Sequence, residues 1–99
     1  MSILVELFPE TGFGGEPLPI REAGDVRDLR TQYPDYWTRI RSIRVNENAV
    51  LRAFSETDFR HEEMTCLPGE ERDRLNSNNF SDRIKSFKVY DANNLQRPY

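Results

Sequence analysis

The sequence predicts an all-β fold, a two-sheet antiparallel β-sandwich built from two Greek-key motifs. One observation behind this prediction is an internal repeat. The segment WTRIRSIRV, which begins at Trp37, returns as FSDRIKSFKV, which begins at Phe80, and Ser42 then matches Ser86. The second observation is that each half of the 99-residue chain carries short strand signals separated by turn residues, without a long helical pattern. A chain of this length is expected to form one domain with a modest core.

The first expected element is a strand over residues 3–8. Its alternation places Val5 and Leu7 on one face and Glu6 and Phe8 on the other. This is the pattern of a strand with one face in the core.

A folded-over hairpin is expected next. Phe8 and Phe13 bracket a turn-rich segment that ends in glycines, the last of which is Gly15. Glycine at such a place indicates positive φ or a close backbone crossing, and the two aromatic rings are expected to stack on each other. Pro17 and Pro19 lie in the following strand and favour an edge position for it, because proline cannot donate to a sheet ladder.

The rest of the first half is predicted to be turns that lead to one central strand. Residues 23–25 are expected to form a turn, residues 26–30 a short helical turn at most, and residues 33–36 another turn. This last turn delivers the chain into the central strand at 37–45.

The second half repeats this order. Arg52 takes the place of Glu6 and Phe54 that of Phe8, so the alternation between inward and outward positions is kept. Phe54 is again followed by four residues and an aromatic, Phe59. The remaining elements are an edge strand at 64–67, a turn at 68–69, a short polar segment at 70–75 and the repeated central strand at 80–89.

The domain is expected to span residues 1–90, with motif one at 1–46 and motif two at 47–90. Residues 91–99 carry no periodicity and are predicted to be a C-terminal tail, ordered only if Leu95 or Tyr99 meets a groove.

The composition of the chain limits the kinds of molecule that it is expected to bind. The net charge of -3 argues against nucleic acid, which needs a clustered cationic face, and favours a basic surface on another protein. No apolar stretch approaches the roughly 20 residues that cross a bilayer, and the N-terminus lacks the basic region of a signal peptide, so we expect no membrane and a cytoplasmic location. The single cysteine, Cys66, is expected to be a small buried hydrophobe.

Three features of the sequence resemble a known family. One is the pattern from Phe8 to Gly15, which consists of an aromatic, four residues, an aromatic, any residue and a glycine. The others are the segments DVRDLRTQYPDYWTRIRSIRV and LPGEERDRLNSNNFSDRIKSFKV. Over roughly residues 3–90 the chain resembles a single domain of the β/γ-crystallin superfamily, built of two Greek-key motifs. The resemblance implies that Ser42 and Ser86 form hydrogen bonds that pin the folded hairpin of their motifs, a structural role.

The resemblance also implies calcium, which in binding members is held by a signature of Asn or Asp twice, two variable residues, Ser or Thr, then Ser. The two copies here read WTRIRS and SDRIKS. The fifth position is a cation in both, Arg41 and Lys85, and the positions Arg39 and Arg83 also carry charge, while Asp82 keeps one carboxylate. Calcium wants about six to eight oxygen ligands. We therefore expect two degenerate sites, calcium binding to be lost, and no cofactor.

Two arrangements remain open for Arg41 and Lys85. Each charged head either takes the position of the ion, beside groups such as Asp82, or points into solvent while its stem packs on the sheet.

His61 stands where the second hairpin should have its glycine. It is expected to bear some strain or to mark a hairpin that opens differently, and to be exposed rather than a metal ligand. The acidic pairs at 62–63 and 70–71 are expected to point apart on a solvated surface, and neither Ser42, Ser86 nor Cys66 has a triad signature around it. The sequence therefore predicts no enzyme.

The sequence therefore predicts a non-enzymatic module that binds an unidentified protein partner. Inhibition of that partner is one possible form of binding, since the resemblance extends to single-domain microbial inhibitors and toxins. The alternative is a calcium-binding or stress-related structural crystallin. We expect a monomer or a weak homodimer, because Pro17 and Pro19 discourage pairing through one edge.

Overall fold

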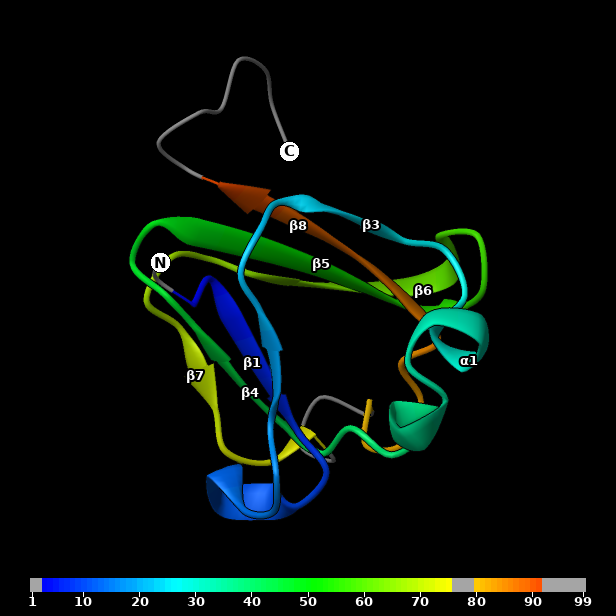
Figure 1. Ribbon diagram of the computed structural model, residues 1–99, viewed down its shortest axis with the longest axis horizontal. Coiled ribbons are helices and arrows are strands. Elements are labelled where there is room, and N and C mark those ends of the chain that lie inside the picture. The colour runs from blue at the N-terminus through cyan, green and yellow to red at the C-terminus, as the bar shows by residue number, and fades with distance from the viewer. Residues whose placement is uncertain (1–2, 76–79, 92–99) are drawn as a thin grey trace.

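The protein forms two antiparallel four-stranded sheets packed face to face, with strand orders β2-β1-β4-β7 and β3-β8-β5-β6 (Figure 1). The computed structural model describes residues 3–75 and 80–91. The predicted all-β sandwich is confirmed. Its helical part within these residues is short, and none of the helices there has the length and apolar character needed to cross a membrane.

The elements of the first half are β1 (Val5–Phe8), η1 (Thr11–Phe13), β2 (Leu18–Ile20), β3 (Gly24–Val26), α1 (Leu29–Gln32), η2 (Pro34–Tyr36) and β4 (Ser42–Val45). Those of the second half are β5 (Ala49–Glu56), β6 (Arg60–Cys66), β7 (Glu71–Arg72) and β8 (Ser86–Asp91).

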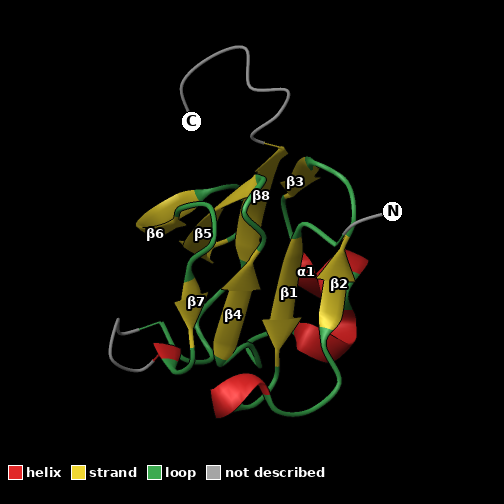
Figure 2. Cartoon of the chain, turned by 90° about the vertical axis from the view of Figure 1, so that its left-hand side faces the viewer, coloured by secondary structure: helices red, strands yellow, loops and turns green. Residues whose placement is uncertain are grey.

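Each motif gives its third strand to the sheet of the other motif. β3 pairs with β8, through Gly24 opposite Val89 and Val26 opposite Phe87, while β7 pairs with β4. The two outer edges of each sheet are therefore made by different motifs, as Figure 2 shows for β7, β4, β1 and β2. Neither motif completes a sheet without the other, so the halves form one interdependent unit.

The core lies between the sheets and follows the predicted alternation. Val5, Leu7, Leu51 and Ala53 are fully buried, as expected for the inward positions of the first strand in each motif. Burial of this apolar surface is the main stabilising contribution to the fold. β2, with its two prolines nearby, lies at a sheet edge, and so does β6, as predicted, although β6 begins at Arg60 and ends at Cys66 rather than spanning 64–67.

Two segments predicted to be a turn and a loop contain strands. Residues 23–25 are not a turn, because Gly24–Val26 forms β3, and the polar segment 70–75 contains β7. In β3 only Val26 is buried, so this strand shows no alternation that a sequence pattern could reveal.

The central strands are also shorter than predicted. β4 starts at Ser42 and β8 at Ser86, each in the middle of its expected segment, since the preceding residues form the loops described below. The helical turn expected at 26–30 lies later, as α1 (Leu29–Gln32), because the Asp28 side chain accepts the Arg30 N–H and caps it there.

Candidate functional site

Both motifs carry the folded-over hairpin. The ring centroids of Phe8 and Phe13 lie 5.6 Å apart with planes at 69°, and those of Phe54 and Phe59 lie 5.6 Å apart at 67°. These are edge-to-face contacts, the geometry that aromatic quadrupoles favour. A cation covers the second ring of each pair: the Arg44 guanidinium lies 4.2 Å from Phe13, and Lys88 Nζ lies 4.5 Å from Phe59.

A buried serine closes each hairpin. Ser42 Oγ accepts the Phe13 N–H at 3.1 Å and donates to the Glu10 carbonyl at 2.5 Å. Ser86 makes the same two contacts, with the Phe59 N–H at 3.1 Å and the Glu56 carbonyl at 2.5 Å. Both serines have no exposed surface. These are the hydrogen bonds that the resemblance implied, and they hold backbone groups of the hairpin that would otherwise be unpaired.

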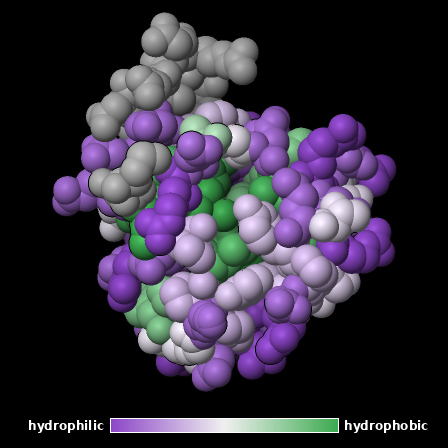
Figure 3. Space-filling view, viewed as in Figure 1, coloured by the Kyte–Doolittle hydropathy of each residue, from purple (hydrophilic) through white to green (hydrophobic). Residues whose placement is uncertain are grey.

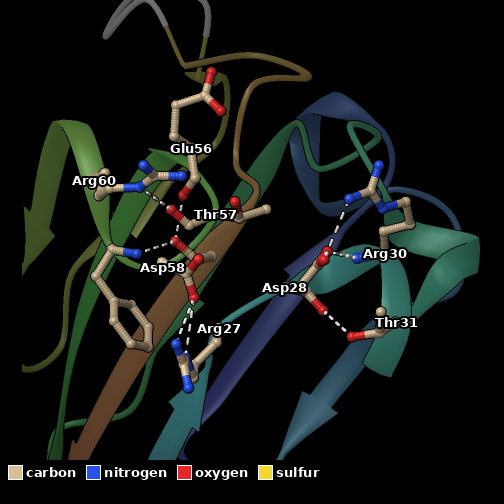
Figure 4. A network of polar contacts seen from close by, with 10 residues as sticks. Arg27, Asp28, Arg30, Thr31, Glu56, Thr57, Asp58 and Arg60 are labelled. Carbon is tan, nitrogen blue, oxygen red and sulfur yellow. Dashed lines mark hydrogen bonds and ion pairs between the residues drawn. The ribbon is translucent and has the colours of Figure 1, made fainter.

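The hairpins also tie the two motifs to each other. The Gly12 N–H donates to the Asp73 carbonyl at 2.6 Å, and the Asp58 N–H donates to the Arg27 carbonyl at 2.8 Å. Beside this second contact Arg27 forms an ion pair with Asp58 at 2.9 Å and Arg60 donates to the Thr57 carbonyl, as Figure 4 shows. Each hairpin tip is therefore held by the opposite motif.

The residues before the two central strands form a pair of equivalent loops, which we call loop one (residues 37–41) and loop two (residues 81–85). Thr38 in loop one and Asp82 in loop two occupy matching places, and both have positive φ, 51° and 60°. The loops lie against each other, since the Asp82 N–H donates to the Ile40 carbonyl at 3.1 Å. The two loops that carry the repeated signature therefore lie side by side, and we call them together the composite site.

An ion pair occupies the first half of this site. Arg41 Nε lies 3.0 Å from Oδ1 and 3.2 Å from Oδ2 of Asp82, so it bridges loop one to loop two. The hydrogen bond to Asp82 and then its charge raise the pKa of Arg41. The pair faces an open depression of about 400 Å³, whose lining comprises Pro9, Glu10, Thr11, Thr38, Arg39, Arg41 and Asp82.

The second half of the site has a different partner. Its cation is Lys85, whose Nζ lies 3.5 Å from Glu56 Oε2. It also lies 5.7 Å from the ring of Trp37. A depression of about 280 Å³ is lined here by Thr38, Ser55, Glu56, His61, Asp82, Arg83 and Lys85.

The structure therefore shows Arg41 and Lys85 in ion pairs with carboxylates, while the prediction that their heads take the position of an ion stays a prediction. The neighbouring cations, Arg39 and Arg83, line the same two depressions but form their hydrogen bonds and ion pairs with groups outside the composite site. Arg39 donates to the Asp35 carbonyl at 3.3 Å, and Arg83 forms an ion pair with Glu62. The sequence did not predict the ion pair between Glu56 and Lys85, because the two residues meet only when the second hairpin folds back over the sheet.

His61 is exposed and has a φ of 72°, so it adopts the conformation that Gly15 has in the first motif at 79°. The hairpin keeps its shape, and the histidine bears the strain. Its Nδ1 lies 3.1 Å from Oγ of Ser55, a buried residue that also accepts the Glu62 N–H. No cluster of three His, Cys, Asp or Glu side chains suited to a metal ion occurs within residues 3–75 and 80–91.

The acidic pairs point apart, as predicted. Glu63 pairs with Arg52 at 2.6 Å, whereas its neighbour Glu62 pairs with Arg83. The pair at 70–71 divides in the same way, between Arg72 and Arg44. Cys66 is fully buried, and burial raises the pKa of its thiol to about 11, which keeps it unreactive near neutral pH.

No known protein-family profile matches the chain, and no curated protein does either. Solved structures do. A domain from work on the evolution of the eye lens βγ-crystallin domain fold matches with a TM-score of 0.82 and 22% identity, over 89% of this chain and 85% of that one. A βγ-crystallin from Ciona intestinalis gives 0.71 and 23%, over 87% and 98%. A clostrillin double mutant in complex with nickel gives 0.75 and 16%, over 90% and 99%.

Proposed function

We propose that this domain, which has the fold of a βγ-crystallin domain, is a non-enzymatic binding module for a protein partner that does not use calcium. The observation that carries the proposal is the Arg41–Asp82 ion pair, 3.0 Å from nitrogen to oxygen, across the two loops. A cation already joins the loops there.

Simple electrostatics supports the loss of calcium binding. A divalent ion placed between the loops would have to displace the Arg41 head from Asp82 and then sit beside a positive charge. In loop two, Lys85 would oppose the ion and already engages Glu56, the nearby carboxylate. Neither side chain offers an oxygen ligand, and calcium binds through oxygen.

A binding role is supported by what the reactive groups do. The carboxylates at 62–63 and 70–71 are each held by a different arginine. The thiol of Cys66 is buried, and the hydroxyls of Ser42 and Ser86 are used to close hairpins. The fold supplies a rigid scaffold, and the net charge of -3 favours a partner with a basic surface. Inhibition of that partner is the form of binding that we propose.

We also propose that the domain acts in the cytoplasm, as a monomer or a weak homodimer. A fold closed by ion pairs suits a compartment with little free calcium. The exposed edge of β2 carries Pro19, which cannot donate to an added strand.

Calorimetric melting with and without calcium tests the metal part of the proposal. We expect the midpoint to move by less than about 1 °C between a chelator and millimolar calcium, because a ligand that does not bind cannot shift the unfolding equilibrium. Magnesium at the same concentration controls for ionic strength. A midpoint that rises by many degrees in calcium alone would overturn the proposal.

Affinity capture tests the binding part. The immobilised domain is compared with an Arg60→Glu variant, which changes the exposed second hairpin tip, and with an Arg21→Glu variant as a control of equal charge at another exposed place. We expect one protein to be retained and to bind the purified domain at a defined stoichiometry. If no retained protein binds the domain after purification, the proposal is contradicted. The comparison of the two variants reports whether the hairpin tip takes part in binding.

The second candidate is a calcium-binding or stress-related structural crystallin. It is favoured by the carboxylates of Glu10, Glu56 and Asp82 around the two depressions, which are oxygen ligands in the right region. The nickel complex of a structural neighbour belongs to an engineered double mutant of that protein. The calcium melting experiment separates the two candidates directly.

A further inference from the structure

We infer that two copies of this chain pair through the free edge of β6, and that an ion pair between Glu70 and Arg72 limits this pairing. β6 is the outermost strand on one side of its sheet, as Figure 2 shows. The inference rests on the weak-homodimer part of the proposed function, to which it adds the surface and the register.

Among the outer strands of the two sheets, β6 is the one best suited to adding a strand. It has 7 residues without proline or glycine, whereas β2 contains Pro19, and β3 and β7 have only 3 and 2 residues. Figure 3 shows one face of the molecule on which apolar side chains lie recessed near the middle and polar ones surround them. Contact through that face would bury many polar groups, so pairing between copies is better served by the backbone at a sheet edge.

The backbone groups of Glu63 and Thr65 face away from the sheet. The Phe54 carbonyl accepts the N–H of the residue before β8, so it points toward β8. Backbone groups alternate in direction along a strand, so those of Ala53 point toward β6, where Met64 lies opposite. Met64 therefore bonds to β5, and its two neighbours direct their N–H and C=O groups outward.

The Glu70–Arg72 pair covers one end of this edge in place of a strand. Glu70 Oε1 accepts the Leu67 N–H at 2.7 Å, and Arg72 lies 3.5 Å from the Thr65 carbonyl. The two side chains are themselves held together at 2.9 Å. The contact to Thr65 is long and therefore weak, so an incoming strand can displace it.

A two-fold antiparallel pairing with Glu63 opposite Thr65 of the other copy fits the hydrogen bonds and the charges. Each such pair exchanges both of its N–H···O=C bonds, and Met64 then lies opposite Met64 of the other copy. Arg52 already neutralises Glu63 at 2.6 Å, and the residue opposite is an uncharged hydroxyl. A shift that placed Glu63 opposite itself would oppose like charges. Leu67, a large apolar side chain that is 45% exposed, directly follows the strand and would gain cover.

Amide hydrogen exchange on the unmodified chain tests this surface. We expect the Glu63 and Thr65 amides to exchange quickly in dilute solution and more slowly as concentration rises, while the Met64 amide stays protected throughout. With a dissociation constant on the order of 1 mM, about half of the chains would be paired at about 1 mM, and exchange would slow about twofold. Thr65→Pro removes only an outward N–H, so it should keep the fold and abolish the concentration dependence at Glu63.

Sedimentation of a Glu70→Ala with Arg72→Ala variant tests the role of the ion pair. This variant frees the covered end of the edge in both copies, so we expect dimerisation to tighten by about tenfold or more. The matched control is Arg44→Ala with Glu71→Ala, which removes another ion pair of 2.9 Å that involves β7 and does not touch β6. The control should dimerise no more than the unmodified chain.

Three results would overturn the inference. One is exchange at Glu63 and Thr65 that does not depend on concentration up to about 1 mM, which decides the question even where Glu70→Ala with Arg72→Ala does not fold. Another is dimerisation that persists in Thr65→Pro, which would leave the proposed weak homodimer standing on a different surface. The third is an equal gain in the control, which would remove the role of the Glu70–Arg72 pair. The calcium proposal is independent of these outcomes, because none of these four residues lines either depression.

Discussion

Replacing both loop cations with the hydroxyl that the calcium signature calls for should create a metal site. The variant is Arg41→Ser with Lys85→Ser. It removes the two positive charges and frees Asp82 and Glu56, the carboxylates that now pair with them. We expect the variant to bind calcium where the unmodified protein does not.

The expected size of the effect follows from exposure and mass action. The side chains of Arg41 and Asp82 are 49% and 40% exposed, so losing their ion pair should change the melting midpoint little in the absence of metal. With a dissociation constant on the order of 10⁻⁴ M, about 10 mM calcium would add about 2.7 kcal/mol per site. For a domain of this size that raises the midpoint by roughly 10–20 °C.

The assay combines calorimetric melting with fluorescence of Trp37, the only tryptophan, which lies beside Lys85. The matched control is Arg44→Ser with Lys88→Ser, which removes two cations that cover the Phe13 and Phe59 rings and do not line either depression. Calcium should leave the control unchanged. No heat of binding and no midpoint shift in Arg41→Ser with Lys85→Ser would refute the reasoning, since ligands other than the two hydroxyls would then be missing.

Three further changes test the parts that hold the site. Ser42→Ala should lower stability by about 1–3 kcal/mol in thermal denaturation followed by circular dichroism, because it leaves a hairpin N–H unpaired; an unchanged midpoint would contradict this. The Leu67 N–H and then Arg72 lower the pKa of Glu70, so its contribution is complete above the ordinary carboxyl pKa of about 4.3 and is lost as pH falls through the lower folded value. The midpoint gap between the unmodified protein and Glu70→Gln should therefore shrink below about pH 4, and a gap that stays constant would argue against it. Gly15→His should be destabilising alone and partly rescued by Pro9→Ser, with a coupling of about 1 kcal/mol in a double-mutant cycle; strict additivity would exclude the coupling.

The sequence was sufficient for the sandwich and the stacked rings because these follow from repeated local patterns, whereas the closing role of Ser42 and Ser86 was implied by the family resemblance. Phe8 and Phe13 recur as Phe54 and Phe59, and each pair lies within a few residues of sequence. The exchange of β3 and β7 between sheets was not predictable in this way. Those strands have 3 and 2 residues, and their pairing is set by the opposite motif rather than by their own pattern.

The same limit applies to the composite site. Arg41 and Lys85 were identified as the anomalous positions, and Asp82 as a partner, by comparing both copies with the calcium signature that the family resemblance implies. It did not identify Glu56, because that residue reaches Lys85 only through the fold of the hairpin. Thr38 explains the difference between the two halves of the composite site, because it occupies the place in loop one that Asp82 has in loop two. Loop one therefore offers Lys85 no matching carboxylate, and Lys85 pairs with Glu56 instead.

The second motif differs from the first at His61, which replaces a glycine, and at Ser55, which replaces a proline, and the two differences are coupled. A Cβ on Gly15 would lie 2.7 Å from Pro9 Cγ, so the first hairpin requires glycine for space as well as for its φ of 79°. The second motif has Ser55 in the place of Pro9, at the offset that relates Phe8 to Phe54. The smaller serine leaves room for a side chain, and its hydroxyl lies 3.1 Å from His61 Nδ1. The hydrogen bond offsets part of the left-handed strain, which for a residue other than glycine costs roughly 1–2 kcal/mol. A loss of glycine in one hairpin is thus compensated by a second change in the strand before it, and both changes face the depression that Lys85 lines.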